Sequence, residues 1–147
     1  MYRVLKANGE KVADATYKAG SAMKRGMLVV KGTTGDADFP ASATDKNVFF
    51  VGGEYTATGI NGNRDLPDYD TAFEDIADGD FIVLEKPVAG EEYFTDQFTT
   101  GVAVGNFANV GTNGKFVTAG TTATKFVVKA TDYVDCGHTG IIVEVLD

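Results

Sequence analysis

Cysteine, histidine and tryptophan are almost missing from this sequence. The 147 residues contain one cysteine, one histidine and no tryptophan. A single cysteine cannot form an internal disulfide, so we expect the chain to fold in a reducing compartment. One cysteine and one histidine also leave too few soft ligands for the usual zinc sites.

Long apolar runs are absent as well. No stretch approaches the roughly 18 consecutive apolar residues of a membrane-spanning helix, and the first eleven residues, MYRVLKANGEK, lack the apolar core of a secretory signal. The length and the 44% hydrophobic content suit one domain with its own core. We therefore expect a soluble, single-domain protein that is made inside the cell and has no membrane partner.

Basic residues are too few and too scattered for a nucleic-acid-binding surface. Thirteen Lys and Arg stand against 21 Asp and Glu, which gives a net charge of −8. Lys24 and Arg25 are the only adjacent pair of basic residues. Binding to a phosphate backbone needs clustered positive charge, so a nucleic-acid partner is not expected.

Leucine is scarce, whereas β-branched residues are abundant. The sequence has 17 Val, 17 Thr and 5 Ile against 5 Leu. β-branched side chains lose rotamer freedom in helices and pack well on a pleated sheet. The predicted fold class is mainly β, either a small β-barrel or a β-sandwich, with little helix. Thr71 to Glu74 has the spacing of a capping box, which predicts one or two helical turns or a loop around Phe73.

Short apolar runs bounded by turn residues mark the expected strands. The clearest runs are 27–31, 47–51, 80–86, 125–129 and 140–146, and the weaker ones are 2–6, 53–58, 92–94, 102–104 and 115–118. Residues 33–45 are predicted to form a loop. Asn113-Gly114 is predicted to form a hairpin turn, because Asn-Gly tolerates the positive φ angles of a tight turn.

Residues 1–20 contain few large apolar side chains, unlike the rest of the chain. We expect an extended N-terminal arm over 1–20 and a single β domain over 21–147. An extended segment can add a strand to a neighbour's sheet edge. The candidate residues for contacts between subunits or with a capsid are therefore those of the apolar run in this arm, Tyr2, Arg3, Val4, Leu5 and Lys6.

The stretch DYVDCGHTG, residues 132–140, holds both Cys136 and His138. A zinc site would need further ligands beyond this pair and the two nearby aspartates. A nucleophilic cysteine would need the histidine within hydrogen-bond reach and a third group to orient it. The glycines on both sides of His138 favour a turn that leads into the last strand. A histidine that meets its copies in an oligomer is a further alternative.

Residues 65–80, DLPDYDTAFEDIADGD, contain seven acids. Their spacing does not match the twelve-residue calcium loop, so a solvated acidic loop is favoured. A contact surface for a basic partner and a calcium site remain alternatives. The motifs of phosphate-binding loops and of the serine-nucleophile elbow are absent from the chain. We expect no catalytic residues, no metal and no cofactor.

Three segments carry a resemblance to a known family. They are AGSAMKRGMLVVKG, FPASATDKNVFFVGGEY and IADGDFIVLEKPVAGEEYFTDQF, which surround the blocks Lys24–Lys31, Pro40–Val51 and Gly90–Phe98. Over about residues 18–147 the chain resembles small structural proteins of tailed-bacteriophage heads, in particular capsid decoration, or cement, proteins. The shared motifs are patterns of turns and strands, and none of them is a catalytic signature.

The resemblance implies a β-rich, β-tulip-like, non-enzymatic virion protein on the outer surface of a phage capsid. Its partners would be the major capsid protein and two further copies of itself, as a trimer at three-fold positions of the shell. It would be made in the cytoplasm of the bacterial host. The alternatives are another virion component, such as a head–tail connector, tail tube, fibre or adhesion module, and an enzyme built on Cys136 and His138.

Overall fold

The computed structural model describes residues 1–9, 12–43, 45–52, 74–135 and 137–147. Every regular element among these residues is a β-strand. The expected mainly β fold is confirmed, and its scarcity of leucine and wealth of β-branched residues are the physical reason. The capping box at Thr71 lies almost entirely outside the described residues, and so does the run 53–58.

Six strands form the first sheet, and neighbouring strands in it are antiparallel. In spatial order they are β1 (Tyr2–Lys6), β10 (Glu92–Thr95), β14 (His138–Val145), β13 (Phe126–Asp135), β11 (Phe107–Val110) and β12 (Phe116–Gly120). β1 and β12 are its two edges.

A second six-stranded sheet lies against the first. Its spatial order is β2 (Ala13–Asp14), β9 (Val83–Glu85), β7 (Phe49–Gly52), β5 (Leu28–Lys31), β6 (Asp36–Asp38) and β3 (Lys18–Ala19). A separate pair of strands is formed by β4 (Met23–Lys24) and β8 (Asp75–Ile76). Within the described residues both large sheets are open, so the arrangement is a sandwich rather than a closed barrel.

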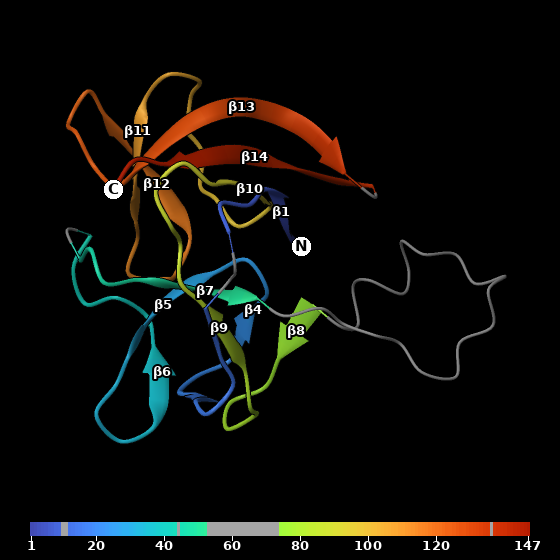
Figure 1. The fold of residues 1–147 in the computed structure, drawn as a ribbon, viewed down its shortest axis with the longest axis vertical. Helices are drawn as coiled ribbons and strands as arrows, with labels where there is room; N and C mark the ends of the chain where they lie inside the picture. Colours follow the sequence, from blue (N-terminus) through green and yellow to red (C-terminus); the bar gives the residue numbers. More distant parts are fainter. Residues whose placement is uncertain (10–11, 44, 53–73, 136) are drawn as a thin grey trace, which may run out of the picture.

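The main core fills the space between the two sheets (Figure 1). Phe50 of β7 meets Tyr93 of β10 at 4.6 Å between ring centroids, and Phe116 and Phe126 surround it. Aromatic contacts of this kind stabilise a core beyond the area that they bury. The planar side chains noted in the sequence therefore join the two sheets.

The second sheet is buried on both faces, which explains the apolar run FFVG of β7. Successive side chains of a strand point to opposite faces. Phe50 accordingly enters the core between the sheets, whereas Phe49 and Val51 enter a second apolar cluster with Met23 and Met27. A strand covered on both faces is expected to read as a continuous apolar run.

The predicted hairpin turn at Asn113-Gly114 is confirmed. β11 and β12 pair antiparallel with Val110 opposite Phe116, and Gly114 has a φ of 74°. A Cβ atom at Gly114 would lie 2.7 Å from the ring of Phe39, so glycine is required by space as well as by φ.

Some local expectations were wrong. Residues 102–104 form no strand, and the loop expected over 33–45 contains β6. The strand that follows the weak candidate at 102–104 is β11, whose sequence FANV alternates between half-buried and buried residues. Asn and Ala are depleted in strands, which hid this element from propensity.

The N-terminal segment lies on the body of the protein in this structure. Its strands β1, β2 and β3 pair with β10, β9 and β6 of the same chain. The extended arm expected over 1–20 is replaced by two edge strands and a short parallel pairing. None of the helices among the described residues has the length and apolarity needed to cross a membrane.

Candidate functional site

The stretch DYVDCGHTG forms the end of a long hairpin. β13 runs to Asp135 and β14 starts at His138, with Asp135 opposite His138, so residues 136–137 alone separate the strands. The turn predicted here is therefore confined to two residues, and most of the stretch is strand. Cys136 lies outside the described residues, so its proposed roles as nucleophile or zinc ligand gain no geometry.

His138 takes part in a polar network at the base of this hairpin end. Its Nδ1 lies 3.0 Å from Oδ2 of Asp96, in the segment that follows β10. The amine of Met1 lies 2.5 Å from Oδ1 of Asp96 and 2.8 Å from a carboxylate oxygen of Glu74. The histidine thus joins three separate parts of the chain.

The environment of Asp96 favours its charged form. Partial burial by itself raises the pKa of this carboxyl. Hydrogen bonds from the Met1 amine, the Gln97 amide and His138 act in the opposite direction and hold the pKa of Asp96 below its usual value. Asp96 is therefore a carboxylate at neutral pH, available to fix the orientation of His138.

The end of the hairpin is also tied to the edge strand β1. The Nε of Arg3 lies 2.9 Å from Oδ2 of the buried Asp135, and another guanidinium nitrogen donates to Oδ1 at 3.2 Å. Tyr133 lies against Phe94 of β10, with 5.7 Å between ring centroids. Val134, in contrast, points outward and is 63% exposed.

The backbone just before this end is irregular. The pairing of β13 with β14 shifts register between Val128 and Ala130 and again between Ala130 and Tyr133. Asp132, inside the second shift, has a φ of 56°. Asp is among the few residues besides Gly that visit this region. Bulges of this kind redirect the side chains that follow them.

The five candidate contact residues of the N-terminus all belong to β1. The ring of Tyr2 packs 4.9 Å from that of Phe50, and Val4 packs against the same core. Arg3 and Lys6 are exposed, and Leu5 is half-buried. β1 pairs with β10 on one side and is an edge of the sheet on the other. Its role in contacts between subunits remains a prediction.

Two buried carboxylate–tyrosine pairs support this edge. The hydroxyl of Tyr2 donates to Glu85 of β9 at 2.8 Å, which links the two sheets. Tyr93 donates to Glu91, which also accepts from the backbone amides of Val88 and Asn8. Burial and the nearby carboxylate raise the pKa of both tyrosines. These groups hold the architecture, and nothing about them suggests a reaction.

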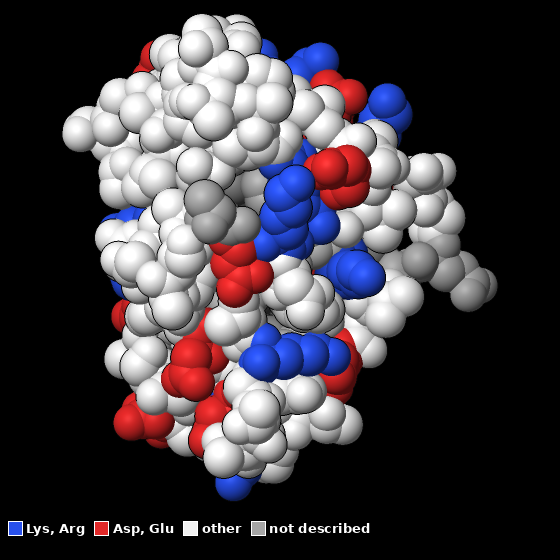
Figure 2. Space-filling model, turned by 90° about the vertical axis from the view of Figure 1, so that its left-hand side faces the viewer, with Lys and Arg blue, Asp and Glu red and all other residues white. Residues whose placement is uncertain are grey.

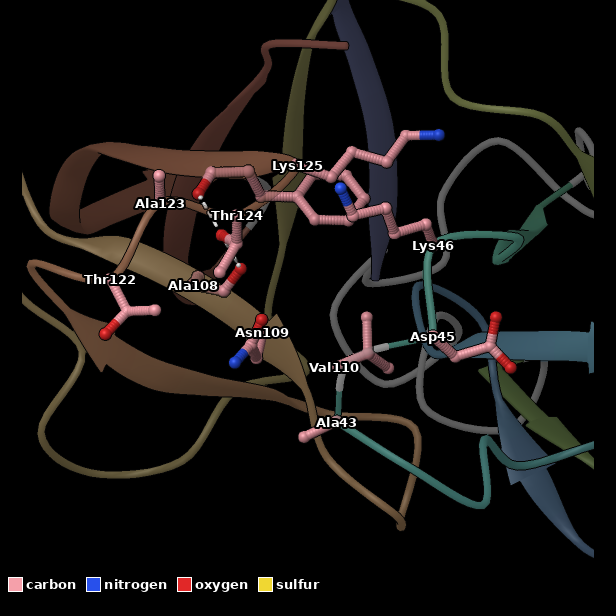
Figure 3. A pocket seen from close by; sticks show the side chains of 11 residues that line it. Ala43, Asp45, Lys46, Ala108, Asn109, Val110, Thr122, Ala123, Thr124 and Lys125 are labelled. Carbon is pink, nitrogen blue, oxygen red and sulfur yellow. Dashed lines mark hydrogen bonds between the residues drawn. The ribbon is translucent and has the colours of Figure 1, made fainter.

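A small hollow opens on the side of the molecule opposite the hairpin end (Figure 3). Its volume is about 110 Å³. Its walls come from the loop before β7, from β11 and from the turn between β12 and β13; they are residues 43, 45, 46, 108–110 and 122–126. Most of the wall surface is apolar, with Val110 and Phe126 at the core side.

Two lysines border the hollow. Figure 3 shows the side chains of Lys46 and Lys125 along the same rim, while the carboxylate of Asp45 points away. Asp45 instead accepts a hydrogen bond from the backbone amide of Asn47 at 3.0 Å. Burial lowers the pKa of Lys125, the nearby Lys86 lowers it further, and Asp147 acts in the opposite direction. The rim is therefore a place where positive charge is only partly compensated.

The acidic stretch 65–80 is described only from residue 74 onward. There Glu74 contacts the Met1 amine, and Asp75 lies 3.0 Å from Lys24. In the part of the chain that the structure describes, no three metal-binding side chains come together. Residues 65–73 lie outside this part, and the calcium alternative there stays untested.

Sequence reasoning missed the hollow because its walls come from three segments far apart in the chain. None of these segments carries a recognisable motif, and only Lys46 and Lys125 have reactive side chains. Comparison with models of known families, with curated proteins and with solved structures gives no match. The function must therefore be argued from the chain itself.

Proposed function

We propose that this protein is a non-enzymatic structural component of a tailed-phage virion, which binds the outer surface of the capsid and stabilises the shell. Its partners are the major capsid protein and further copies of itself, probably three around each three-fold position being the arrangement that the family resemblance suggests. Neither a cofactor nor a metal is part of this proposal.

The resemblance in sequence is the observation that carries the proposal. Its three blocks correspond to elements at the centre of the fold. Lys24–Lys31 includes β5, Pro40–Val51 leads into β7, and Gly90–Phe98 includes β10. Leu28, Phe50 and Tyr93 from these blocks meet in the core between the sheets. The likeness therefore concerns residues that specify a fold, which supports kinship more strongly than a likeness of surface loops.

The open sheets suit a protein that works by surface contact. Edge strands β1 and β12 present backbone groups along the two sides of the first sheet. Such edges can pair with a strand of another chain. The exposed Arg3 and Lys6 on β1 add charge to this edge.

Cementing a shell requires binding alone. A protein that binds the assembled shell and not its free subunits stabilises the shell by an amount set by its concentration relative to the dissociation constant. Repetition of the same contact over the shell makes a modest affinity effective.

Copy number in purified virions tests this function. Quantitative mass spectrometry would give the ratio of this protein to the major capsid protein. We expect one copy per shell subunit or a simple fraction of that number. A handful of copies per particle would favour the alternative, a connector, tail or fibre component. Absence from particles would overturn the structural proposal altogether.

A further inference from the structure

The size of the lysine-bordered hollow decides what it can hold. At about 110 Å³ it is well below the roughly 300–1,000 Å³ of pockets for cofactors and other small molecules. It is somewhat smaller than an apolar cavity of about 150 Å³ that accommodates benzene. A single aliphatic side chain is the group that matches this volume and its largely apolar wall.

The charge around the hollow adds a second requirement. Lys46 and Lys125 share the rim, and Lys86 lies close enough to Lys125 to lower its pKa. Figure 2 shows this side of the molecule, on which basic side chains gather near the middle. A carboxylate next to the entering aliphatic group would relieve the repulsion between these lysines. The hollow is thus suited to an aliphatic side chain with an acidic neighbour.

The end of the β13–β14 hairpin presents this combination. Val134 is 63% exposed, and the exposed Asp132 lies two residues before it. In Figure 1 the hairpin ends on the right of the molecule, whereas the start of β13 and the C-terminus lie on the left. The aliphatic group and the hollow therefore lie on opposite sides of one chain, so one copy cannot fill its own hollow.

The hairpin end is held in place before any contact forms. The Arg3–Asp135 pair, the Tyr133–Phe94 ring contact and the His138–Asp96 pair fix its strands against β1 and β10. A group that is already ordered loses less conformational entropy on binding. This makes an exposed valine a better anchor than one on a free loop.

We propose that Val134 of one copy enters the hollow of a second copy, where Asp132 lies against Lys46 and Lys125. Because the two surfaces differ, the contact is head-to-tail, and such contacts close into rings or grow into filaments. The contact is a property of the free protein and does not rest on the proposed function. A ring of three is one of the closed forms that it permits.

A mixing experiment with two single-site variants tests this contact. Val134→Asp removes the anchor, and Lys46→Glu reverses charge at the rim on an exposed side chain. We expect wild-type protein to associate in sedimentation velocity and native mass spectrometry. Each variant alone should associate at least tenfold more weakly. An equimolar mixture should form one-to-one dimers and nothing larger, because only one intact pair of surfaces remains.

The control is Val104→Asp, which places the same charge on a valine that is 59% exposed outside both surfaces. It should associate as the wild type does, and far-ultraviolet circular dichroism should show all variants folded. Added salt should weaken the wild-type contact, since exposed charges are screened.

Three results would overturn the inference. They are a wild-type protein that stays monomeric at all concentrations, variants that associate as the wild type does, and a mixture that recovers no dimer. The copy number in virions is measured separately and does not depend on this contact. Failure of one proposal therefore leaves the other standing.

Discussion

The two ends of the β13–β14 hairpin are held by different forces. At the inner end, Phe126, Val128, Val143 and Val145 are almost fully buried between the sheets. At the outer end, ion pairs and one ring contact hold the strands, and Val134 faces solvent. One continuous pair of strands thus serves as core at one end and as exposed surface at the other.

This difference separates stability from contact. Burial of apolar area contributes most of the free energy of folding and depends little on pH. Polar pairs near the surface contribute less, and pH and salt change them. The inner end should therefore determine the stability of the whole domain, and the outer end should open locally.

Removal of a ring at the inner end should have the largest effect. Phe126 is 2% exposed and packs edge-to-face on Phe116, with 5.1 Å between centroids. Phe126→Ala should lower the free energy of unfolding by about 3–5 kcal/mol, because it leaves a cavity in the core. Urea denaturation followed by circular dichroism measures this loss. A loss below about 1 kcal/mol would contradict the importance of the inner end.

Breaking the Arg3–Asp135 pair should have a smaller and more local effect. Arg3→Met keeps an apolar stem but leaves the buried Asp135 carboxylate without its guanidinium, at a cost of about 1–3 kcal/mol. Hydrogen exchange should become faster in residues 129–135 and stay unchanged in 126–128. Lys6→Met, on the same strand, is the matched control and should stay within about 0.5 kcal/mol of the wild type. Uniformly faster exchange along β13 would argue against two separate ends.

Acid should weaken the outer end through Asp96. Its folded-state pKa is below the unfolded value of about 3.9, so its contribution to stability is complete above that value. The contribution is lost as the pH falls through the folded-state pKa. Asp96→Asn should therefore lower stability at pH 7 and flatten its decrease toward acid. Urea denaturation of both proteins between pH 7 and pH 3 checks this, and equal slopes would contradict it.

Polar substitution of the exposed valine should have the smallest effect on the folded chain. Val134→Ser should change the free energy of unfolding by no more than about 0.5 kcal/mol, because the side chain is 63% exposed. The measurement belongs at a dilution where the wild type is monomeric. A larger loss would show that Val134 supports the fold of its own chain.

Much of the first-order fold follows from local sequence. The runs at 27–31 and 47–51 correspond to β5 and β7, and the weaker run at 2–6 coincides with β1. The run at 125–129 marked only the inner half of β13. Its outer half, from Ala130 to Asp135, was read as a turn because its acids and the following glycine are typical of loops. Pairing with β14 overrode this preference.

Composition alone determined that the protein is mainly β, because β-branched side chains favour a pleated surface wherever they occur. The Asn113-Gly114 turn was equally local, because its φ angles require those residues. Only the tertiary structure decided that the sheets form a sandwich, that β1 docks on β10, and where the hollow lies. These features join residues far apart in the chain, and contacts between distant segments leave no periodic pattern in either one.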